Sequence, residues 1–194
     1  MKKTLFIALL MMISAMLFAG PFGMEFGWTL EELEASGVYT WEPTRQGSVT
    51  SYWASPIKPH SQLSLYIVFI DDEYGLFDIR SVADASYSES QVRTLYNTLK
   101  AQLSSVYGEP EEYDEIDWLS DLTGSGNFIK SIFHGDRILN STWYLDSTDD
   151  NETSMVVLGV LTPDEYTAFV GVEYYSHACE KVFTKYNEAE ASVL

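Results

Sequence analysis

A long amphipathic segment between residues 88 and 108 constrains the fold more than any other feature of the sequence. Ser88 and Gln91 have the spacing of a helix N-cap and its third helical residue, and Gly108 and Pro110 are typical of a helix end. The apolar positions between these ends recur at helical spacing and are Val92, Leu95, Tyr96, Leu99, Leu103, Val106 and Tyr107. A helix with one apolar face must bury that face, so we expect this helix to lie on a β-sheet.

Strand patterns surround this helix. Apolar side chains alternate over residues 62–71 and continue over 75–83 after the turn DDEYG, so we predict a hairpin. The other elements expected are strands at 137–145, 154–161 and 168–175 and short helices at 30–36 and 128–133. Together they predict the α+β class, with an antiparallel sheet of about five strands, one long amphipathic helix packed on it and one or two shorter helices.

Three segments lack a clear pattern. Residues 38–59 contain three prolines and are interpreted as irregular, apart from one strand near 49–54. Residues 109–117 hold six acidic residues and predict an exposed connection. The tail from Ser176 is expected to be a short helix with a frayed end. In this arrangement the long helix faces the hairpin of 62–83, and Leu99 lies in the main core.

The first twenty residues are typical of a secretory signal peptide. Two lysines precede an uncharged apolar run at 4–19, which is shorter than the ~20 residues that a helix needs to cross a bilayer. Cleavage after Ala19 fits the small residues there. We therefore expect a signal peptide at 1–20, a single α+β domain at 21–194 and a periplasmic or secreted location, without stable membrane insertion after cleavage. An uncleaved N-terminal anchor is the alternative, and it also places the domain outside the cytoplasm.

The chain is strongly acidic. It has 29 Asp and Glu residues against 11 Lys and Arg residues, which gives a formal net charge of −18. Loss of Lys2 and Lys3 with the signal peptide leaves 9 basic against 29 acidic residues, or a net charge of −20. Such a field repels phosphate backbones, so we expect no nucleic-acid partner and favour a basic protein partner in the cell envelope. Cys179 is the only cysteine, which excludes an intramolecular disulfide and a lipid anchor at the cleavage point.

The polar residues form no recognisable catalytic or metal-binding motif. Acids gather at 71–73, 109–117 and 146–152, all in expected connections, where carboxylates stay solvated. The last of these lacks the glycine at position six of a calcium loop, which leaves at most a weak calcium site. Ser55-Pro-Ile-Lys58 matches S-x-x-K, but its prolines argue against the helix that this motif opens. We therefore expect no catalytic residue, no cofactor and no metal site, and hence a protein that is not an enzyme.

Tyrosines on the expected strands give one candidate binding surface. Alternation turns Tyr144, Glu173 and Tyr175 away from the inward-facing residues of their strands, and Tyr66 joins them if that face of the hairpin is open. A row of tyrosines on a sheet can form a partner surface. The alternative is that a helix covers these residues as part of the core, because the expected helices need a sheet face to bury.

Two short segments carry a family resemblance. The opening FGMEFGWTLEEL at 22–33 and the later YGEP at 107–110 resemble small exported bacterial proteins of unknown function, as found in spirochaetes. Within the first segment, the pattern G-x-T-x-E-E-L is also similar to the start of the small outer-membrane assembly lipoproteins of the SmpA type. This sequence lacks the cysteine to which their lipid is attached. The resemblance implies no known active site, so no site residue is transferred from it.

Three functions remain open at this point. The first is an exported non-enzymatic domain that binds a protein or acts as an envelope-associated accessory protein. The second is a carrier of a small apolar or cationic ligand held between the sheet and the helix of 88–107. The third is a hydrolase with an unrecognised site. A pocket with apolar walls and a few convergent polar groups would favour the carrier, and buried acids with raised pKa values in a cleft would favour the hydrolase.

Overall fold

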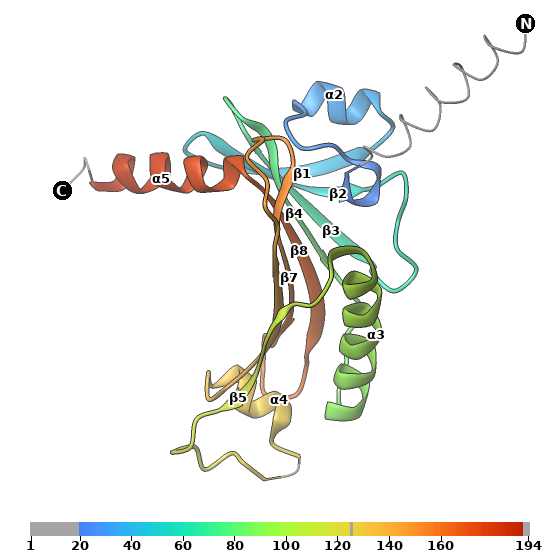
Figure 1. Ribbon diagram of the computed structural model, residues 1–194, viewed down its shortest axis with the longest axis vertical. Coiled ribbons are helices and arrows are strands. Elements are labelled where there is room, and N and C mark those ends of the chain that lie inside the picture. The colour runs from blue at the N-terminus through green and yellow to red at the C-terminus, as the bar shows by residue number, and fades with distance from the viewer. Residues whose placement is uncertain (1–19, 125, 192–194) are drawn as a thin grey trace, which may run out of the picture.

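The computed structural model describes residues 20–124 and 126–191 and has an α+β architecture (Figure 1). The predicted signal peptide lies outside the described residues apart from Gly20. Within the described residues no helix combines the length and the apolar character needed to cross a membrane. In chain order the elements are η1 (Pro21–Gly23), α2 (Leu30–Ala35), β1 (Tyr39–Gln46), β2 (Val49–Ser55), β3 (Leu65–Asp71), β4 (Gly75–Val82), α3 (Glu89–Tyr107), β5 (Glu111–Ile116), α4 (Phe128–Phe133), β6 (Arg137–Tyr144), β7 (Thr153–Leu161), β8 (Phe169–Ser176) and α5 (Ala178–Ala191).

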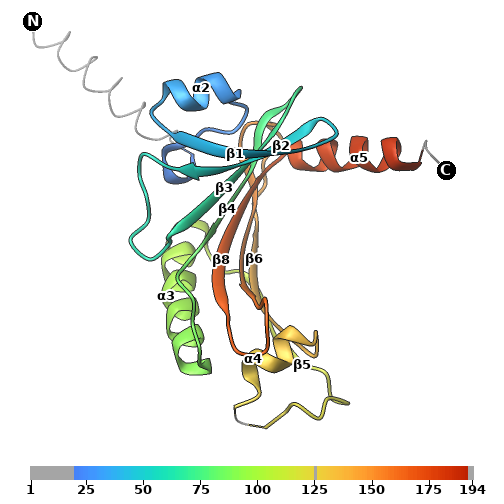
Figure 2. The same cartoon turned by 180° about the vertical axis from the view of Figure 1, so that it is seen from behind.

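Eight antiparallel strands form one sheet in the order β1-β2-β3-β4-β8-β7-β6-β5 (Figure 2). Strands β1 to β4 make one meander and β5 to β8 make another, and the two meanders join where β4 pairs with β8. The prediction of a sheet of about five strands is therefore wrong. The hairpin of β3 and β4 and the strands β6, β7 and β8 lie where the sequence pattern predicts them.

The two strands that the pattern missed, β1 and β5, are the two edges of the sheet. Strand β5 reads EEYDEI and is exposed at every position but its last, so no alternation of buried apolar residues marks it. Strand β1 contains Pro43, which lies where the pairing with β2 shifts register between Trp41 and Thr44. Charged residues and proline are common on edge strands because they hinder pairing with other chains. The same features made both segments resemble loops.

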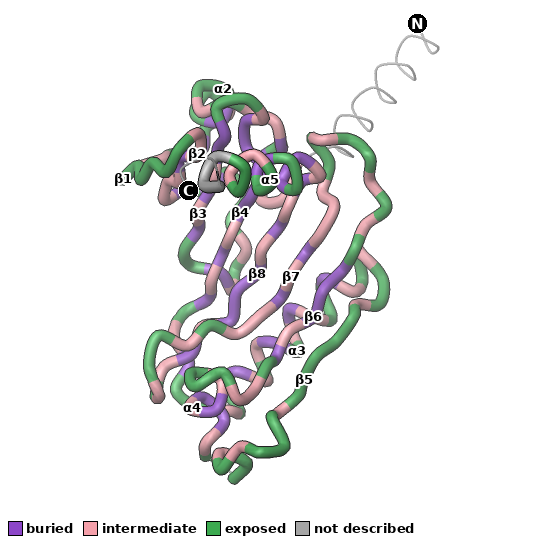
Figure 3. Tube along the Cα trace, turned by 90° about the vertical axis from the view of Figure 1, so that its left-hand side faces the viewer, coloured by how far each residue is buried: buried purple, intermediate pink, exposed green. Residues whose placement is uncertain are grey.

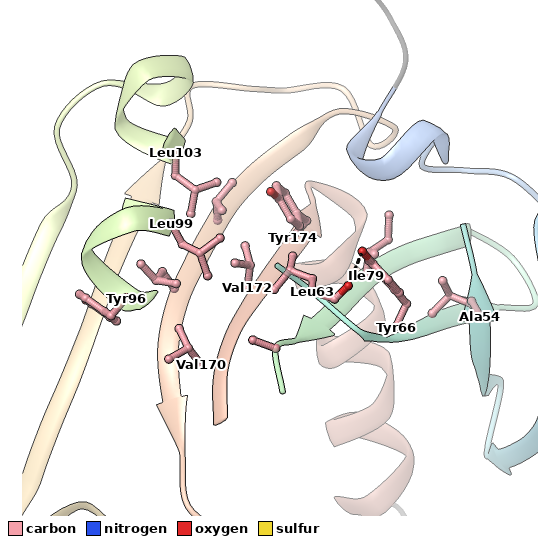
Figure 4. Packing of buried hydrophobic residues seen from close by; sticks show 14 of the residues in the cluster. Ala54, Leu63, Tyr66, Ile79, Tyr96, Leu99, Leu103, Val170, Val172 and Tyr174 are labelled. Atoms are coloured by element: carbon pink, nitrogen blue, oxygen red, sulfur yellow. Dashed lines mark hydrogen bonds between the residues drawn. The ribbon is translucent and has the colours of Figure 1, made fainter. Parts of the chain in front are cut away.

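Helix α3 begins and ends as predicted. The hydroxyl of Ser88 accepts a hydrogen bond from the backbone N–H of Gln91 at 3.3 Å, and Gly108 follows the last turn with φ of 85°. Among the strands, the helix makes its main contacts with β7 and β8 rather than with the hairpin of β3 and β4, so its predicted position facing the hairpin is corrected (Figure 4). Leu99 nevertheless lies in the core and is 2% exposed, whereas Val106, predicted on the apolar face, is 71% exposed.

The face of the sheet that α3 covers, termed the front face, carries the main core. Helix α2 and the segment before it close the same core with Leu33 and Met24, both fully buried. The predicted cap of α2 is present, because the hydroxyl of Thr29 accepts a hydrogen bond from the N–H of Glu32 at 3.2 Å. One residue from each of six adjacent strands lies in register across the front face: Tyr52, Val68, Ile79, Tyr174, Val156 and Trp143.

The opposite face, termed the back face, carries Phe69, Asp78 and Tyr175. Figure 3 shows α5 nearly along its axis at one end of this face, and the rest of the face has no covering helix among the described residues. Helix α5 follows β8 almost directly, and its Val182 packs with Phe77 in a small second hydrophobic cluster. The expected short C-terminal helix is thus a structural element that covers part of the sheet.

Candidate functional site

The strand register places a row of side chains across the back face. The pairing of β3 with β4 shifts register after Phe69, and both Phe77 and Asp78 lie on the back face at this bulge. Residues directly opposite one another on neighbouring strands point to the same face of a sheet. The row therefore crosses seven strands and consists of Thr44, Ser51, Phe69, Asp78, Tyr175, Met155 and Tyr144.

Asp78, at the centre of this row, is paired with Arg80 of the same strand. The Nε and Nη2 groups of Arg80 donate to Oδ2 of Asp78 at 2.9 and 2.8 Å. Asp78 is only 1% exposed, and no donor among the described residues reaches its other oxygen, Oδ1. An unmatched buried acceptor costs about 1–3 kcal/mol, so buried polar groups are normally paired. Oδ1 of Asp78 is therefore a buried acceptor without a donor, which is uncommon in folded proteins.

Two residues of β8 complete the polar group. Glu173 lies opposite Arg80 in the sheet, and its Oε2 is 3.9 Å from Nε of Arg80. Tyr175 lies opposite Asp78 and donates its hydroxyl to Oε2 of Glu173. The guanidinium carbon of Arg80 is 4.6 Å from the centre of the Phe69 ring. One guanidinium thus serves two carboxylates, which gives the group a negative net charge when both are ionised.

Burial controls how these groups titrate. Burial raises the pKa of Asp78 to about 6, although the hydrogen bonds and the positive charge of Arg80 act in the opposite direction. Burial also disfavours the charge of Arg80, but Asp78 outweighs it and the pKa of Arg80 rises above its ordinary value. Burial, followed by the hydrogen bond to Glu173, raises the pKa of Tyr175. At neutral pH the site therefore holds an ionised Asp78, an ionised Arg80 and a neutral Tyr175.

A pocket of about 290 Å³ lies between α5 and the back face. Asp78 and Arg80 form part of its lining, and so does Ser51 of β2. The side-chain amide of Gln46 donates to the hydroxyl of Tyr186 at 2.6 Å and joins β1 to α5 at the border of the pocket. The remaining walls are mainly apolar and aromatic and come from Val49, Phe69, Phe77, Val182, Phe183 and Tyr186.

No family model, no curated protein and no solved structure matches this chain. The resemblance of its opening segment to small exported bacterial proteins therefore stays a prediction. What the site does has to be inferred from its own geometry and chemistry.

The arrangement is suited to holding a molecule. Apolar and aromatic walls with a few convergent polar groups are typical of small-molecule sites. The nearby hydroxyl of Ser51 donates to the backbone carbonyl of Thr44 at 3.4 Å and is not paired with Asp78. Burial raises the pKa of the Cys179 thiol on α5 to about 12, so this thiol is protonated at neutral pH and is a poor nucleophile.

Ion pairs of two lysines also hold α5 in place, and one of these lysines, Lys185, lies 3.7 Å from a carboxylate oxygen of buried Asp71. Lys181 lies 2.6 Å from a carboxylate oxygen of Asp150, and Lys185 lies 2.9 Å from a carboxylate oxygen of Glu73. All four side chains are at least one-third exposed, and exposed pairs contribute only about 0–1 kcal/mol each. The buried apolar contact of Val182 with Phe77 adds to these pairs.

Three of the four residues predicted as a partner surface lie on the back face. Tyr144 is 66% exposed, and Glu173 and Tyr175 are half-buried beside Asp78. Tyr66 instead lies on the front face, is 4% exposed and belongs to the main core (Figure 4). The four residues therefore do not form one surface, because the strand that carries Tyr66 is apolar on both faces. A partner-binding role for the other three stays a prediction.

Sequence reasoning missed the two central residues of the pocket, Asp78 and Arg80. They are two residues apart in the strand GLFDIRSV, which is otherwise almost entirely apolar. Residues two apart on a strand share a face, so opposite charges at this spacing indicate an ion pair that is buried with the strand. That signal was present in the sequence and could have identified the pair.

The acidic loop at 146–152 is expected to bind calcium only weakly. Asp150 already pairs with a lysine of α5, and Asp149 accepts a hydrogen bond at 2.9 Å from a backbone N–H within the loop. We expect calorimetric titration of calcium to give no micromolar affinity, either for the wild type or after joint replacement of Asp149, Asp150 and Glu152 by their amides. Micromolar binding that disappears in the triple variant would contradict this expectation.

Proposed function

We propose that this protein is an exported, non-enzymatic binding domain that takes a small molecule into the pocket between α5 and the back face of the sheet. The observation that carries the proposal is the side chain of Asp78, which lines this pocket while 1% exposed and has one carboxylate oxygen without a donor. A bound molecule that donates to this oxygen would offset the cost of leaving it unpaired. The apolar walls would bury the rest of that molecule.

The position of this pocket differs from the one expected of a carrier. The interface between the sheet and α3 is filled by the main core, in which Tyr96, Leu99 and Leu103 of α3 are buried. The pocket beneath α5 lies on the other side of the sheet. Its volume of about 290 Å³ is at the lower end of the range for ligand sites, roughly 300–1,000 Å³, so a small ligand is favoured over a peptide.

The raised pKa of Asp78 is a feature that would favour a hydrolase. A hydrolytic carboxyl group must face a water, a nucleophile or the leaving group of the substrate. Oδ2 of Asp78 is instead held by both Nε and Nη2 of Arg80, and Arg80 also lies next to Glu173. Asp78 is also the only carboxyl group that lines the pocket among the described residues, so no second carboxyl group is placed to share acid and base roles, which supports binding over catalysis.

The sequence supports the exported location and the kind of molecule that the protein meets. The charged and apolar pattern of residues 1–20 supports a periplasmic or secreted location. The net charge of −18 supports encounters with cationic molecules, because it attracts them over long range. A basic protein partner is kept as a prediction from the same charge, since the pocket itself has the size of a small-molecule site.

Filling the pocket tests the proposal. Ser51 is half-buried and lines the pocket, so the side chain of Ser51→Phe is expected to occupy it. Ser55 lies on the same strand and face but is exposed and lies outside the pocket lining, which makes Ser55→Phe a matched control. A library of small fragments is screened by thermal unfolding. A ligand at 100 times its Kd should raise the Tm of the wild type and of Ser55→Phe by about 5 °C or more, and should leave Ser51→Phe unchanged.

Two results of this screen would overturn the proposal. One is a library in which no fragment stabilises the wild type. The other is a set of stabilising fragments that act equally on Ser51→Phe and Ser55→Phe, which would place binding elsewhere on the protein.

A further inference from the structure

We infer that the ligand of the pocket is a small organic ammonium ion, whose charged group pairs with Oδ1 of Asp78 and whose aromatic or short aliphatic body lies among the rings beneath α5. The inference rests on the proposed function and narrows it to one chemical class. Three features of the pocket support it: an unmatched acceptor, the sign of the local charge and the aromatic lining.

The unmatched acceptor belongs to a residue that lines the pocket, and a ligand with a donor group would pair with it. Both hydrogen bonds from Arg80 go to Oδ2 of Asp78, at 2.9 and 2.8 Å. Oδ1 is buried and no donor among the described residues reaches it. An ammonium group has three N–H donors and no acceptor, so it matches a free carboxylate oxygen without adding a new unpaired acceptor. Charge-assisted bonds of this kind are stronger than bonds between neutral groups.

The sign of the local charge favours a cation. Asp78 and Glu173 both lie against the single guanidinium of Arg80, at 2.8 and 3.9 Å respectively. Tyr175 is neutral at neutral pH, because burial and its bond to Glu173 raise its pKa. Asp78 and Arg80 line the pocket and Glu173 lies beside them, so with both carboxylates ionised this group has one excess negative charge, which attracts a cation and repels a carboxylate or phosphate ligand.

The lining also matches an ammonium ion. Phe69, Phe77, Phe183 and Tyr186 all line the pocket. The faces of aromatic rings attract cations, and clusters of such rings recognise organic ammonium groups. Arg80 already uses this attraction, since its guanidinium lies 4.6 Å from the centre of the Phe69 ring.

The volume sets the size of the ligand. An apolar cavity of about 150 Å³ is large enough to bind benzene. The pocket measures about 290 Å³ and therefore has room for one ring with an attached aminomethyl group. Benzylamine has this size and charge and is a suitable probe.

Calorimetric titration of the purified protein with three molecules of similar shape tests the inference. The probes are benzylamine, which is a cation, benzyl alcohol, which is a neutral donor, and benzoate, which is an anion. We expect benzylamine to bind at least tenfold more tightly than benzyl alcohol, and benzoate not to bind. Ser51→Phe should abolish benzylamine binding and Ser55→Phe should retain it.

A charge-removing variant adds a second measurement. Asp78→Asn keeps the shape of the side chain and should weaken benzylamine binding at least tenfold while changing the affinity for benzyl alcohol less than threefold. Asp84→Asn makes the same change at an exposed position just beyond β4 and should bind benzylamine as the wild type does. If Asp78→Asn does not fold, the three probes on the wild type and the Ser51→Phe variant still decide the question.

The outcomes separate this inference from the proposed function. Equal or tighter binding of benzyl alcohol or benzoate, lost in Ser51→Phe, would overturn the ammonium ion and leave a small-molecule site in place. Retention of benzylamine binding in Asp78→Asn would also overturn the inference. Absence of binding by all three probes would overturn it as well, and the fragment screen on the same variants would then decide separately whether the pocket binds any small molecule.

Discussion

Replacement of Leu99 by alanine is expected to lower the free energy of unfolding by about 2–5 kcal/mol. Leu99 lies in the middle of α3, is 2% exposed and points toward the sheet near Val172 (Figure 4). Truncation removes buried apolar surface and leaves a cavity that neighbouring side chains fill only in part, and both effects destabilise the folded state. Urea denaturation followed by circular dichroism measures the change as a shift of the midpoint at constant slope.

Val106 supplies the matched control on the same helix. It is also aliphatic but is 71% exposed, so Val106→Ala should change the free energy of unfolding by less than about 0.5 kcal/mol. Equal losses in the two variants would mean that α3 does not present Leu99 to the sheet. An unchanged midpoint for Leu99→Ala would contradict the position of α3 over β7 and β8.

Replacement of Asp78 by asparagine is expected to change how stability depends on pH. The pKa of Asp78 is about 6 in the folded protein and 3.8 ordinarily, so between these values the folded state keeps a proton that the unfolded state has released. The wild type therefore loses stability as pH rises through this window. A shift of this size corresponds to about 3 kcal/mol. Asparagine does not ionise, so the stability of Asp78→Asn relative to wild type should rise by about that amount between pH 3.5 and pH 7.5.

The surroundings of Asp78 set the controls for this measurement. The charged groups that act on Asp78 are Arg80 of the same strand and Glu173 of β8. The Tyr175 hydroxyl and the Cys179 thiol lie nearby and stay neutral across this pH window, because their pKa values are raised. Asp84→Asn, at an exposed position, should follow the wild-type curve. A curve for Asp78→Asn that runs parallel to that of the wild type would mean that Asp78 titrates as a solvated carboxyl group.

The sequence predicts those elements that contain a local marker, such as a capping residue or an alternation of apolar residues. Ser88 and Gly108 mark the ends of α3 by capping chemistry, and the Asp71–Gly75 turn joins two alternating strands. The edge strands β1 and β5 could not be recognised in this way, because an exposed edge needs no apolar face and tolerates Pro43 and a run of acids. The position of α3 on the sheet was also beyond the pattern, since it depends on the pairing of β4 with β8.

The site could be predicted only in part for a related reason. Alternation places Glu173 and Tyr175 on one face correctly, but the bulge in β4 breaks the alternation and turns Phe77 and Asp78 to the same face. Tyr66 was misplaced because its strand is apolar on both sides. The pocket is lined by the four strands β1, β2, β3 and β4 together with α5, which is distant from them in the sequence. No local sequence pattern specifies where such a distant helix docks.

The central claim, that the pocket between α5 and the back face is a binding site, is tested most directly by nuclear magnetic resonance. The measurement is the change in backbone amide shifts of the isotope-labelled protein during titration with benzylamine. Saturable changes are expected that centre on Ser51 of β2, Asp78 of β4 and Val182 of α5. Changes that centre on α3 or on the loops, or shifts that stay constant at millimolar benzylamine, would contradict it.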